Sequence, residues 1–277
     1  MGRGPAARAV SRASGGPDRP LAGRRVLVTR GAGQSAGLVE SLRARGAEVV
    51  EVPLLLIAEP ADPRPFRDAV REIDGYDWLL LTSANAAHAI ANATRAIRPS
   101  GAALPRTLRV ASSGPATTAV IRSLFPDTPI AAQPTSRFGS PGLAQALALV
   151  DVSGSRMLLP VSDRSPAAIG ETLLKRGAVV DIVVAYRTTI AEAAGPDLRA
   201  ALDRGIDAAT FASPSAVEAF VRLGGMPGDT PAVVIGPTTA EAASDAGLSV
   251  AETAEPETTD GLVAAVERCL ARTRKTP

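Results

Sequence analysis

Serine and threonine side chains gather directly after four short apolar runs of the chain. The segments are Thr82-Ser83-Ala84-Asn85, Ser112-Ser113-Gly114-Pro115-Ala116-Thr117, Ala212-Ser213-Pro214-Ser215 and Gly236-Pro237-Thr238-Thr239. Each precedes an Ala-rich stretch, where one hydroxyl is explained as a helix N-cap worth about 1 kcal/mol. Further hydroxyls and the free N–H groups of a helix start can bind a carboxylate or a phosphate. The hydroxyl groups of these four segments, Ser113 among them, are therefore candidate ligands of an anionic substrate.

Arg30 follows the first apolar run and opens the glycine-containing segment 30–36, RGAGQSA. This segment matches the relaxed dinucleotide-binding fingerprint, with Glu51 near the end of the next apolar run. The corresponding segment of the second half, 161–166, contains no glycine. Arg30 suits a substrate carboxylate at least as well as a pyrophosphate, and a solvated surface charge is the third interpretation.

The remaining reactive side chains are few. One cysteine, Cys269, and one histidine, His88, exclude disulfides within the chain and metal sites rich in these residues. No paired carboxylates, G-x-S-x-G elbow or Walker loop occurs. Asp77 and Asp207 open apolar runs, where a turn or cap is expected rather than catalysis. Tyr186, one of two tyrosines, ends an apolar run within the sequence AYRT.

The elements that must position these residues alternate between short Val- and Leu-rich runs and longer Ala-rich stretches. This alternation is typical of βα units around parallel sheets. The predicted strands are 24–29, 47–53, 77–82, 108–113, 156–161, 178–184, 207–213, 232–236 and 248–252, with helices between them. In such sheets ligands bind beyond the carboxyl ends of the strands, where the hydroxyl-rich segments lie.

The chain also repeats itself. Arg25 to Gly46 and Arg156 to Gly177 have the same length, and each closes on RGA before a second strand. The later blocks match as well: DWLLLTSANAAHAI with DAATFASPSAVEAF, SSGPATTAVI with IGPTTAEAAS, and PTSRFGSPGLAQAL with PETTDGLVAAV. Four matched blocks in one order predict two copies of a βα series, each able to build a five-stranded open sheet.

Length and charge limit the class of protein. The 277 residues are enough for two domains. The pI of about 9.1 comes from the ends, because residues 1–20 and 271–277 are rich in arginine and the body is net negative. This distribution argues against a nucleic-acid partner. No run of 18 apolar residues and no hydrophobic leader occurs, so we expect a cytoplasmic protein without membrane contact, with a disordered tail over 1–20 and a basic tail over 271–277.

At these blocks the sequence resembles the uroporphyrinogen-III synthases. The matching stretches are LAGRRVLVTR, RGAEVVEVPLL, DWLLLTSANA, LRVASSGPATTA, LLPVSDRS, RGAVVDIVVAYRT, ATFASPSAVEAF, IGPTTAEAASDAGL and PETTDGLVAAV. The resemblance implies an α/β fold of two flavodoxin-like domains, each an open parallel sheet flanked by helices. Residues 21–53 with 190–270 would form one domain and 58–184 the other, with a two-stranded linker at 54–57 and 185–189.

The resemblance also implies a function. The substrate would be hydroxymethylbilane, bound in the cleft between the domains and closed to uroporphyrinogen III with inversion of ring D and loss of water. Tyr186 would assist loss of the hydroxyl, and Ser83, Thr117, Ser213, Thr238 and Thr239 would line the cleft as substrate-binding residues. Arg30 and Ser113 are added to the substrate ligands because they follow strands. No cofactor or metal, a monomer, and transfer of substrate from hydroxymethylbilane synthase are expected. The acidic residue common in the family near Arg137-Phe138-Gly139 is missing.

Two alternatives remain open on the sequence. The first is an NAD(P)-dependent oxidoreductase, which rests on the 30–36 segment and Glu51. The second is a non-enzymatic two-lobed protein that closes on an anionic ligand by hinge motion.

Overall fold

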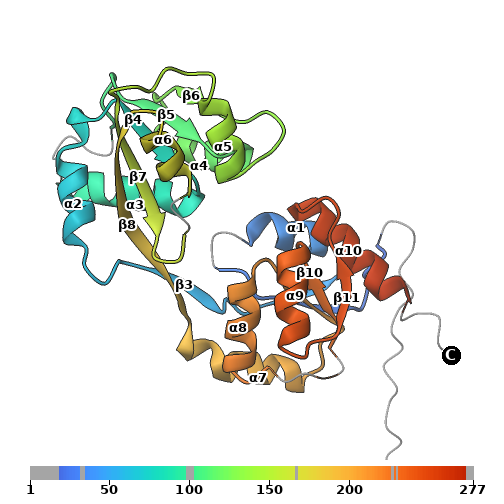
Figure 1. Ribbon diagram of the computed structural model, residues 1–277. Coiled ribbons are helices and arrows are strands. Elements are labelled where there is room, and N and C mark those ends of the chain that lie inside the picture. Colours follow the sequence, from blue (N-terminus) through green and yellow to red (C-terminus); the bar gives the residue numbers. More distant parts are fainter. Residues whose placement is uncertain are drawn as a thin grey trace, which may run out of the picture. The chain divides into compact units, whose positions relative to one another are not determined.

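A computed structural model describes residues 19–31, 35–97, 103–165, 168–225, 228 and 230–272. The chain separates into two compact units (Figure 1). Unit 1 comprises the described residues up to Leu56 and from Ile190 onward, and unit 2 comprises Ile57–Thr189. The expected tails 1–20 and 271–277 lie largely outside the described residues, as do positions 32–34 of the glycine-containing segment. Residues 271 and 272 belong to the last helix.

Unit 1 has a five-stranded parallel sheet in the order β11-β10-β9-β1-β2. Its strands are β1 (Arg25–Val28), β2 (Glu48–Glu51), β9 (Ala208–Phe211), β10 (Ala232–Val234) and β11 (Val250–Thr253). Its helices are α1 (Ala36–Ala44), α7 (Gly195–Asp203), α8 (Pro214–Arg222), α9 (Pro237–Asp245) and α10 (Thr259–Arg272), with a 3-10 turn at Glu192–Ala194. Successive side chains of β1 point to opposite faces. Val26 and Val28 pack against α1 and α10, whereas Leu27 packs against α7, α8 and α9.

Unit 2 has a six-stranded sheet in the order β3-β8-β7-β4-β5-β6. Its strands are β3 (Leu55–Ala58), β4 (Trp78–Leu81), β5 (Arg109–Ser112), β6 (Ile130–Ala132), β7 (Arg156–Ser162) and β8 (Val179–Ile190). Its helices are α2 (Arg64–Arg71), α3 (Ala84–Ile97), α4 (Pro115–Leu124), α5 (Ser140–Leu147) and α6 (Ala168–Leu174), with a 3-10 turn at Ile73–Gly75. The central strand β4 is apolar on both faces. Leu79 and Leu81 pack toward α2, α3 and α4, and Trp78 and Leu80 toward α5 and α6.

All nine predicted strands are present, and the predicted α/β fold of two open sheets is confirmed. The prediction of five strands in each sheet is wrong for unit 2, because β3 pairs with β8 and adds a sixth strand. Strand β8 continues through 185–189 to Ile190, so the chain passes between the units in strand conformation in both β3 and β8. The apolar runs of the sequence predict neither β3, which lies where the family resemblance implies a linker strand at 54–57, nor the three-residue strand β6.

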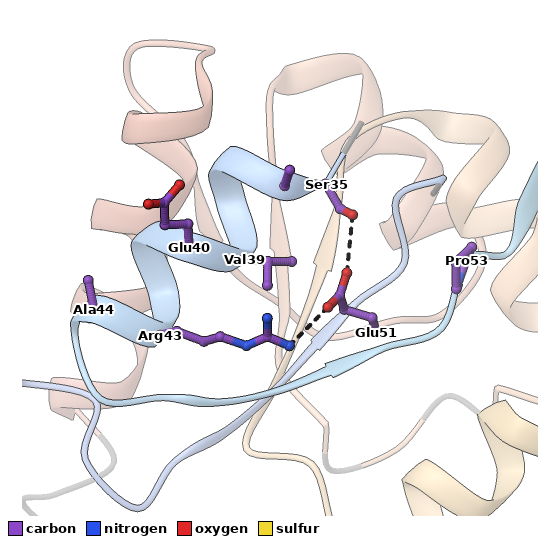
Figure 2. A pocket seen from close by; sticks show the side chains of 8 residues that line it. Ser35, Val39, Glu40, Arg43, Ala44, Glu51 and Pro53 are labelled. Carbon is purple, nitrogen blue, oxygen red and sulfur yellow. Dashed lines mark hydrogen bonds and ion pairs between the residues drawn. The ribbon is translucent and has the colours of Figure 1, made fainter. Parts of the chain in front are cut away.

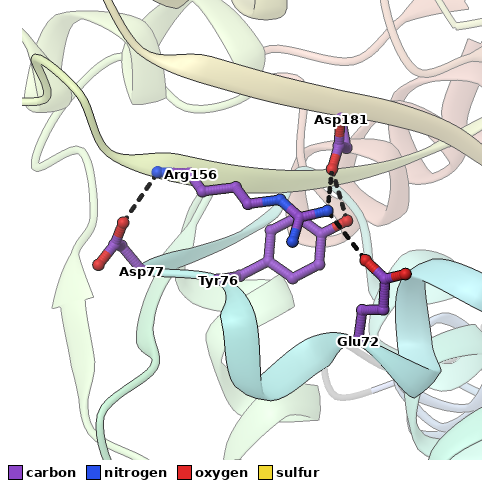
Figure 3. Close-up of polar contacts among 5 residues, drawn as sticks. All are labelled: Glu72, Tyr76, Asp77, Arg156 and Asp181. Carbon is purple, nitrogen blue, oxygen red and sulfur yellow. Dashed lines mark hydrogen bonds and ion pairs between the residues drawn. The ribbon is translucent and has the colours of Figure 1, made fainter.

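The two copies of the repeat exchange their first strand pair. Strands β1 and β2 belong to the first copy but pair in one sheet with β9, β10 and β11 of the second. In both sheets, an aspartate that opens one strand makes two hydrogen bonds to the backbone of an arginine that opens the neighbouring strand. Asp207 accepts a 2.8 Å bond from the Arg25 N–H and donates its own N–H to Arg25 O at 2.8 Å. Asp77 makes the same two bonds to Arg156 at 2.8 Å, and Figure 3 draws the bond to its carboxylate. Asp77 and Asp207 therefore hold the amino ends of strands, away from the hydroxyl-rich segments.

Candidate functional site

Tyr186 and Ser83 meet at the carboxyl edge of the unit 2 sheet. Tyr186 lies in β8 opposite Ser162 of β7, and its ring packs in the core under α3. Its hydroxyl lies 2.9 Å from Ser83 Oγ. Ser83 Oγ also accepts a 3.1 Å bond from the Ala86 N–H and so caps the first turn of α3. Tyr186 is only 7% exposed. Because Ser83 is itself held by its bond to the start of α3, the contact with Ser83 fixes the position of the phenol hydroxyl.

Ser113 and Thr117 form a second hydroxyl pair, at the end of the neighbouring strand β5 and in the first turn of α4. Ser113 Oγ donates to the Thr82 carbonyl oxygen at 2.9 Å. Because a serine hydroxyl has one proton, the 3.2 Å contact between Ser113 and Thr117 has Thr117 as its donor. Both residues are nearly buried. Thr82 joins the two pairs along the edge, because it precedes Ser83 in the chain and accepts from Ser113.

The unit 1 residues chosen from the sequence occupy the equivalent edge of their own sheet. Arg30 follows β1, and burial of its guanidinium group lowers its pKa. No carboxylate in the described part of the chain forms an ion pair with it. Ser213 Oγ caps α8 by accepting from the Ala216 N–H at 3.3 Å. In the first turn of α9, Thr238 is exposed, whereas Thr239 is only 1% exposed and points into the protein.

Two side chains at these edges were not predicted as site residues from the sequence. They surround the starts of α4 and α9, which occupy matching positions in the two repeats, with different chemical groups. A Cβ placed on Gly236, before α9, would lie 2.6 Å from Oε2 of Glu257. A Cβ on Gly114, before α4, would lie 3.1 Å from Cδ1 of Phe138. A carboxylate therefore lies against the start of α9 and an aromatic ring against the start of α4. The only signal in the sequence was the matched block that holds both residues.

Glu51, the acidic residue of the dinucleotide interpretation, is bound by its own unit. Its carboxylate accepts from Arg43 at 3.0 Å and from Ser35 at 3.3 Å (Figure 2). These residues line an open hollow of about 650 Å³ together with Ala36, Val39, Glu40, Ala44 and Pro53. A ribose would have to compete with an arginine for this carboxylate, so the geometry does not favour a dinucleotide at this place.

A polar network surrounds the other tyrosine at the opposite, amino-terminal edge of the unit 2 sheet (Figure 3). The Tyr76 hydroxyl donates to Asp181 at 2.6 Å, and Arg156 bonds both Asp181 and Glu72 at 3.1 Å. The Arg156 guanidinium also lies 4.4 Å from the centre of the Tyr76 ring. Burial, and then the bond to Asp181, raise the pKa of Tyr76. This network joins the segment between α2 and β4 to β7 and β8, and it has no part in the carboxyl edge.

Comparison with known proteins identifies the family. The sequence model described as uroporphyrinogen-III synthase HemD matches residues 21–264. The chain belongs to the uroporphyrinogen-III synthase family. It is 30% identical over 266 residues to a uroporphyrinogen-III synthase of Synechococcus elongatus, covering 91% of this chain and 97% of that protein.

Solved structures of the family share the fold. The uroporphyrinogen-III synthetase of Helicobacter pylori matches with a TM-score of 0.59 at 13% identity, covering 91% of this chain and 100% of the other. A mutant uroporphyrinogen III synthase of Thermus thermophilus matches with a TM-score of 0.56 at 19% identity, covering 90% and 99%. Within the described residues, no helix is both long enough and apolar enough to span a membrane.

Proposed function

We propose that this chain is a uroporphyrinogen-III synthase, which closes hydroxymethylbilane to uroporphyrinogen III with inversion of ring D and loss of water. The family match over residues 21–264 carries the proposal. The contact between Tyr186 and Ser83 supports it, because it provides a positioned phenol at the sheet edge where α/β proteins bind ligands.

Tyr186 acts as the general acid in this proposal. Its O–H proton passes to the hydroxyl of the bilane, the C–O bond breaks with its electron pair, and water leaves. The pyrrole nitrogen supplies the electrons for the new exocyclic double bond, and its N–H proton restores the tyrosine. Ser83 orients the phenol, because Ser83 itself is held by the Ala86 N–H. General acid catalysis of this kind contributes a factor of about 10²–10⁴.

The other polar residues bind and shape the substrate. Ser113 and Thr117 would accept bonds from pyrrole N–H groups at the edge of unit 2, because the Ser113 proton bonds Thr82 and the Thr117 proton bonds Ser113. Arg30, Ser213 and Thr238 would bind carboxylates at the edge of unit 1, whereas the Thr239 side chain points into the protein and would not reach the substrate. Arg30 is suited to this role because its partly buried cation has no protein carboxylate beside it in the described residues. Because a bilane can also close without inversion, positioning is the main task, and positioning can supply about 7–11 kcal/mol.

The isomer of the product tests the proposal. Purified protein receives hydroxymethylbilane made in situ by a deaminase, and the oxidised porphyrins are separated by chromatography. Dominant type III product supports the proposal, and type I alone, as in a protein-free control, refutes it. If the protein were instead an oxidoreductase, NAD(P) would raise its melting temperature.

The proposal includes a cytoplasmic monomer that needs no cofactor and receives its substrate from hydroxymethylbilane synthase.

A further inference from the structure

Phe138 is an aromatic side chain that the protein leaves in solvent. The chain has eight aromatic residues, and all lie in the described part. Seven are buried in the cores, whereas Phe138 is 53% exposed. Burying a phenylalanine stabilises a protein by about 1.5–3 kcal/mol, so packing does not explain its place. Its place beside the candidate site matters, because small-molecule sites are lined mainly by apolar and aromatic side chains.

The backbone around Phe138 holds the ring beside the Ser113–Thr117 pair. The next residue, Gly139, donates its N–H to the Ser113 carbonyl oxygen at 2.9 Å. Gly139 has φ +87°, a left-handed conformation that other residues rarely adopt. The ring lies against Gly114, where a Cβ would be only 3.1 Å from Cδ1. The segment before α5 therefore holds the aromatic ring beside the turn that presents the hydroxyl pair.

We infer that Phe138 stacks against a pyrrole ring of the tetrapyrrole while the Ser113–Thr117 pair bonds polar groups of the same part of the substrate. This inference rests on the proposed function. A flat apolar ring next to hydroxyl oxygens that can accept a hydrogen bond matches a flat heteroaromatic ring that carries an N–H group. At the matching start of α9 the neighbour is the carboxylate of Glu257, which cannot serve as a stacking surface. The two sheet edges thus recognise different features, and ring stacking belongs to unit 2.

The test separates a flat ring from mere apolar bulk. Phe138→Leu keeps an apolar side chain over Gly114 but removes the flat face, Phe138→Ala removes both, and Phe138→Trp keeps a flat face. Leu149→Ala is the matched control, because Leu149 is an apolar residue of the same unit and is 91% exposed. Loss of a stacked pair raises KM by about 2- to 12-fold in Phe138→Ala and Phe138→Leu. KM stays near the wild-type value in Phe138→Trp and Leu149→Ala, and all four variants melt near the wild-type temperature.

A second readout measures binding without turnover. The chain has one tryptophan, Trp78, which is buried in unit 2. Phe138→Trp therefore adds an exposed fluorophore, and anaerobic addition of uroporphyrinogen III changes its emission in a saturable way. Wild-type KM in Phe138→Leu, or no fluorescence response in Phe138→Trp, overturns the stacking role while type III formation by the wild type leaves the proposed function intact. If the wild type forms only type I product, the stacking role falls together with the proposed function.

Discussion

Replacing Tyr186 with phenylalanine removes one hydroxyl and leaves the buried ring in place. Ser83 keeps its bond to the Ala86 N–H, so no buried polar group is stranded. Loss of this hydrogen bond lowers the free energy of unfolding by about 0.5–1.5 kcal/mol. For a protein of this size, the melting temperature falls by about 2–4 °C for each 1 kcal/mol. If the phenol donates the proton that removes water, turnover falls by about 10²–10³ in the same variant.

The assay measures initial rates of type III formation together with thermal unfolding. Tyr76→Phe is the matched control, since it removes the only other tyrosine hydroxyl and breaks a 2.6 Å bond in the same unit, at the opposite edge of the sheet. We expect Tyr76→Phe to lose stability and retain turnover. Turnover of Tyr186→Phe within about threefold of wild type contradicts the general-acid role. Equal losses in both variants contradict it as well, because they would trace to destabilisation of unit 2.

Three further predictions concern the rest of the structure. Asp77→Ala and Asp207→Ala each leave one backbone N–H at the start of a strand without its acceptor. The free energy of unfolding, measured with denaturant, therefore falls by about 1–3 kcal/mol in each variant. A changed isomer ratio would contradict a purely structural role. Glu257→Gln removes a negative charge from the start of α9 and lowers KM for the anionic bilane by about 2- to 5-fold; a higher KM would show that Glu257 assists binding. Burial raises the pKa of the Cys269 thiol, so thiol reagents label it slowly at neutral pH until denaturant is added, and fast labelling of the folded protein would contradict this placement.

The strands were predictable because most are buried on both faces and therefore appear as continuous Val- and Leu-rich runs. Trp78–Leu81 is the clearest case, with four buried side chains in succession. Strand β6 has only three residues, too few to show a pattern. Residues 185–189 contain polar and β-branched side chains, and the pairing of β8 with β3 depends on contacts that are distant in the sequence.

The hydroxyl residues of the site were predictable because they follow strands, and parallel strands bring their carboxyl ends to one edge. Which of them meet was not predictable, since Tyr186 and Ser83 are 103 positions apart. Phe138 and Glu257 were missed because loop residues follow no periodic pattern. Thr238 and Thr239 could not be told apart from the sequence, but in the first turn of α9 Thr238 is exposed and Thr239 is buried.

The most direct test of the account is a titration of the protein against the spontaneous closure of hydroxymethylbilane. At a fixed rate of bilane supply, the fraction of type III porphyrin is measured as the protein concentration rises. We predict that type III displaces type I toward completion with the wild type, and that Tyr186→Phe needs about 10²–10³ times more protein for the same fraction. A fraction of type III that stays at the protein-free value at every concentration would contradict the account.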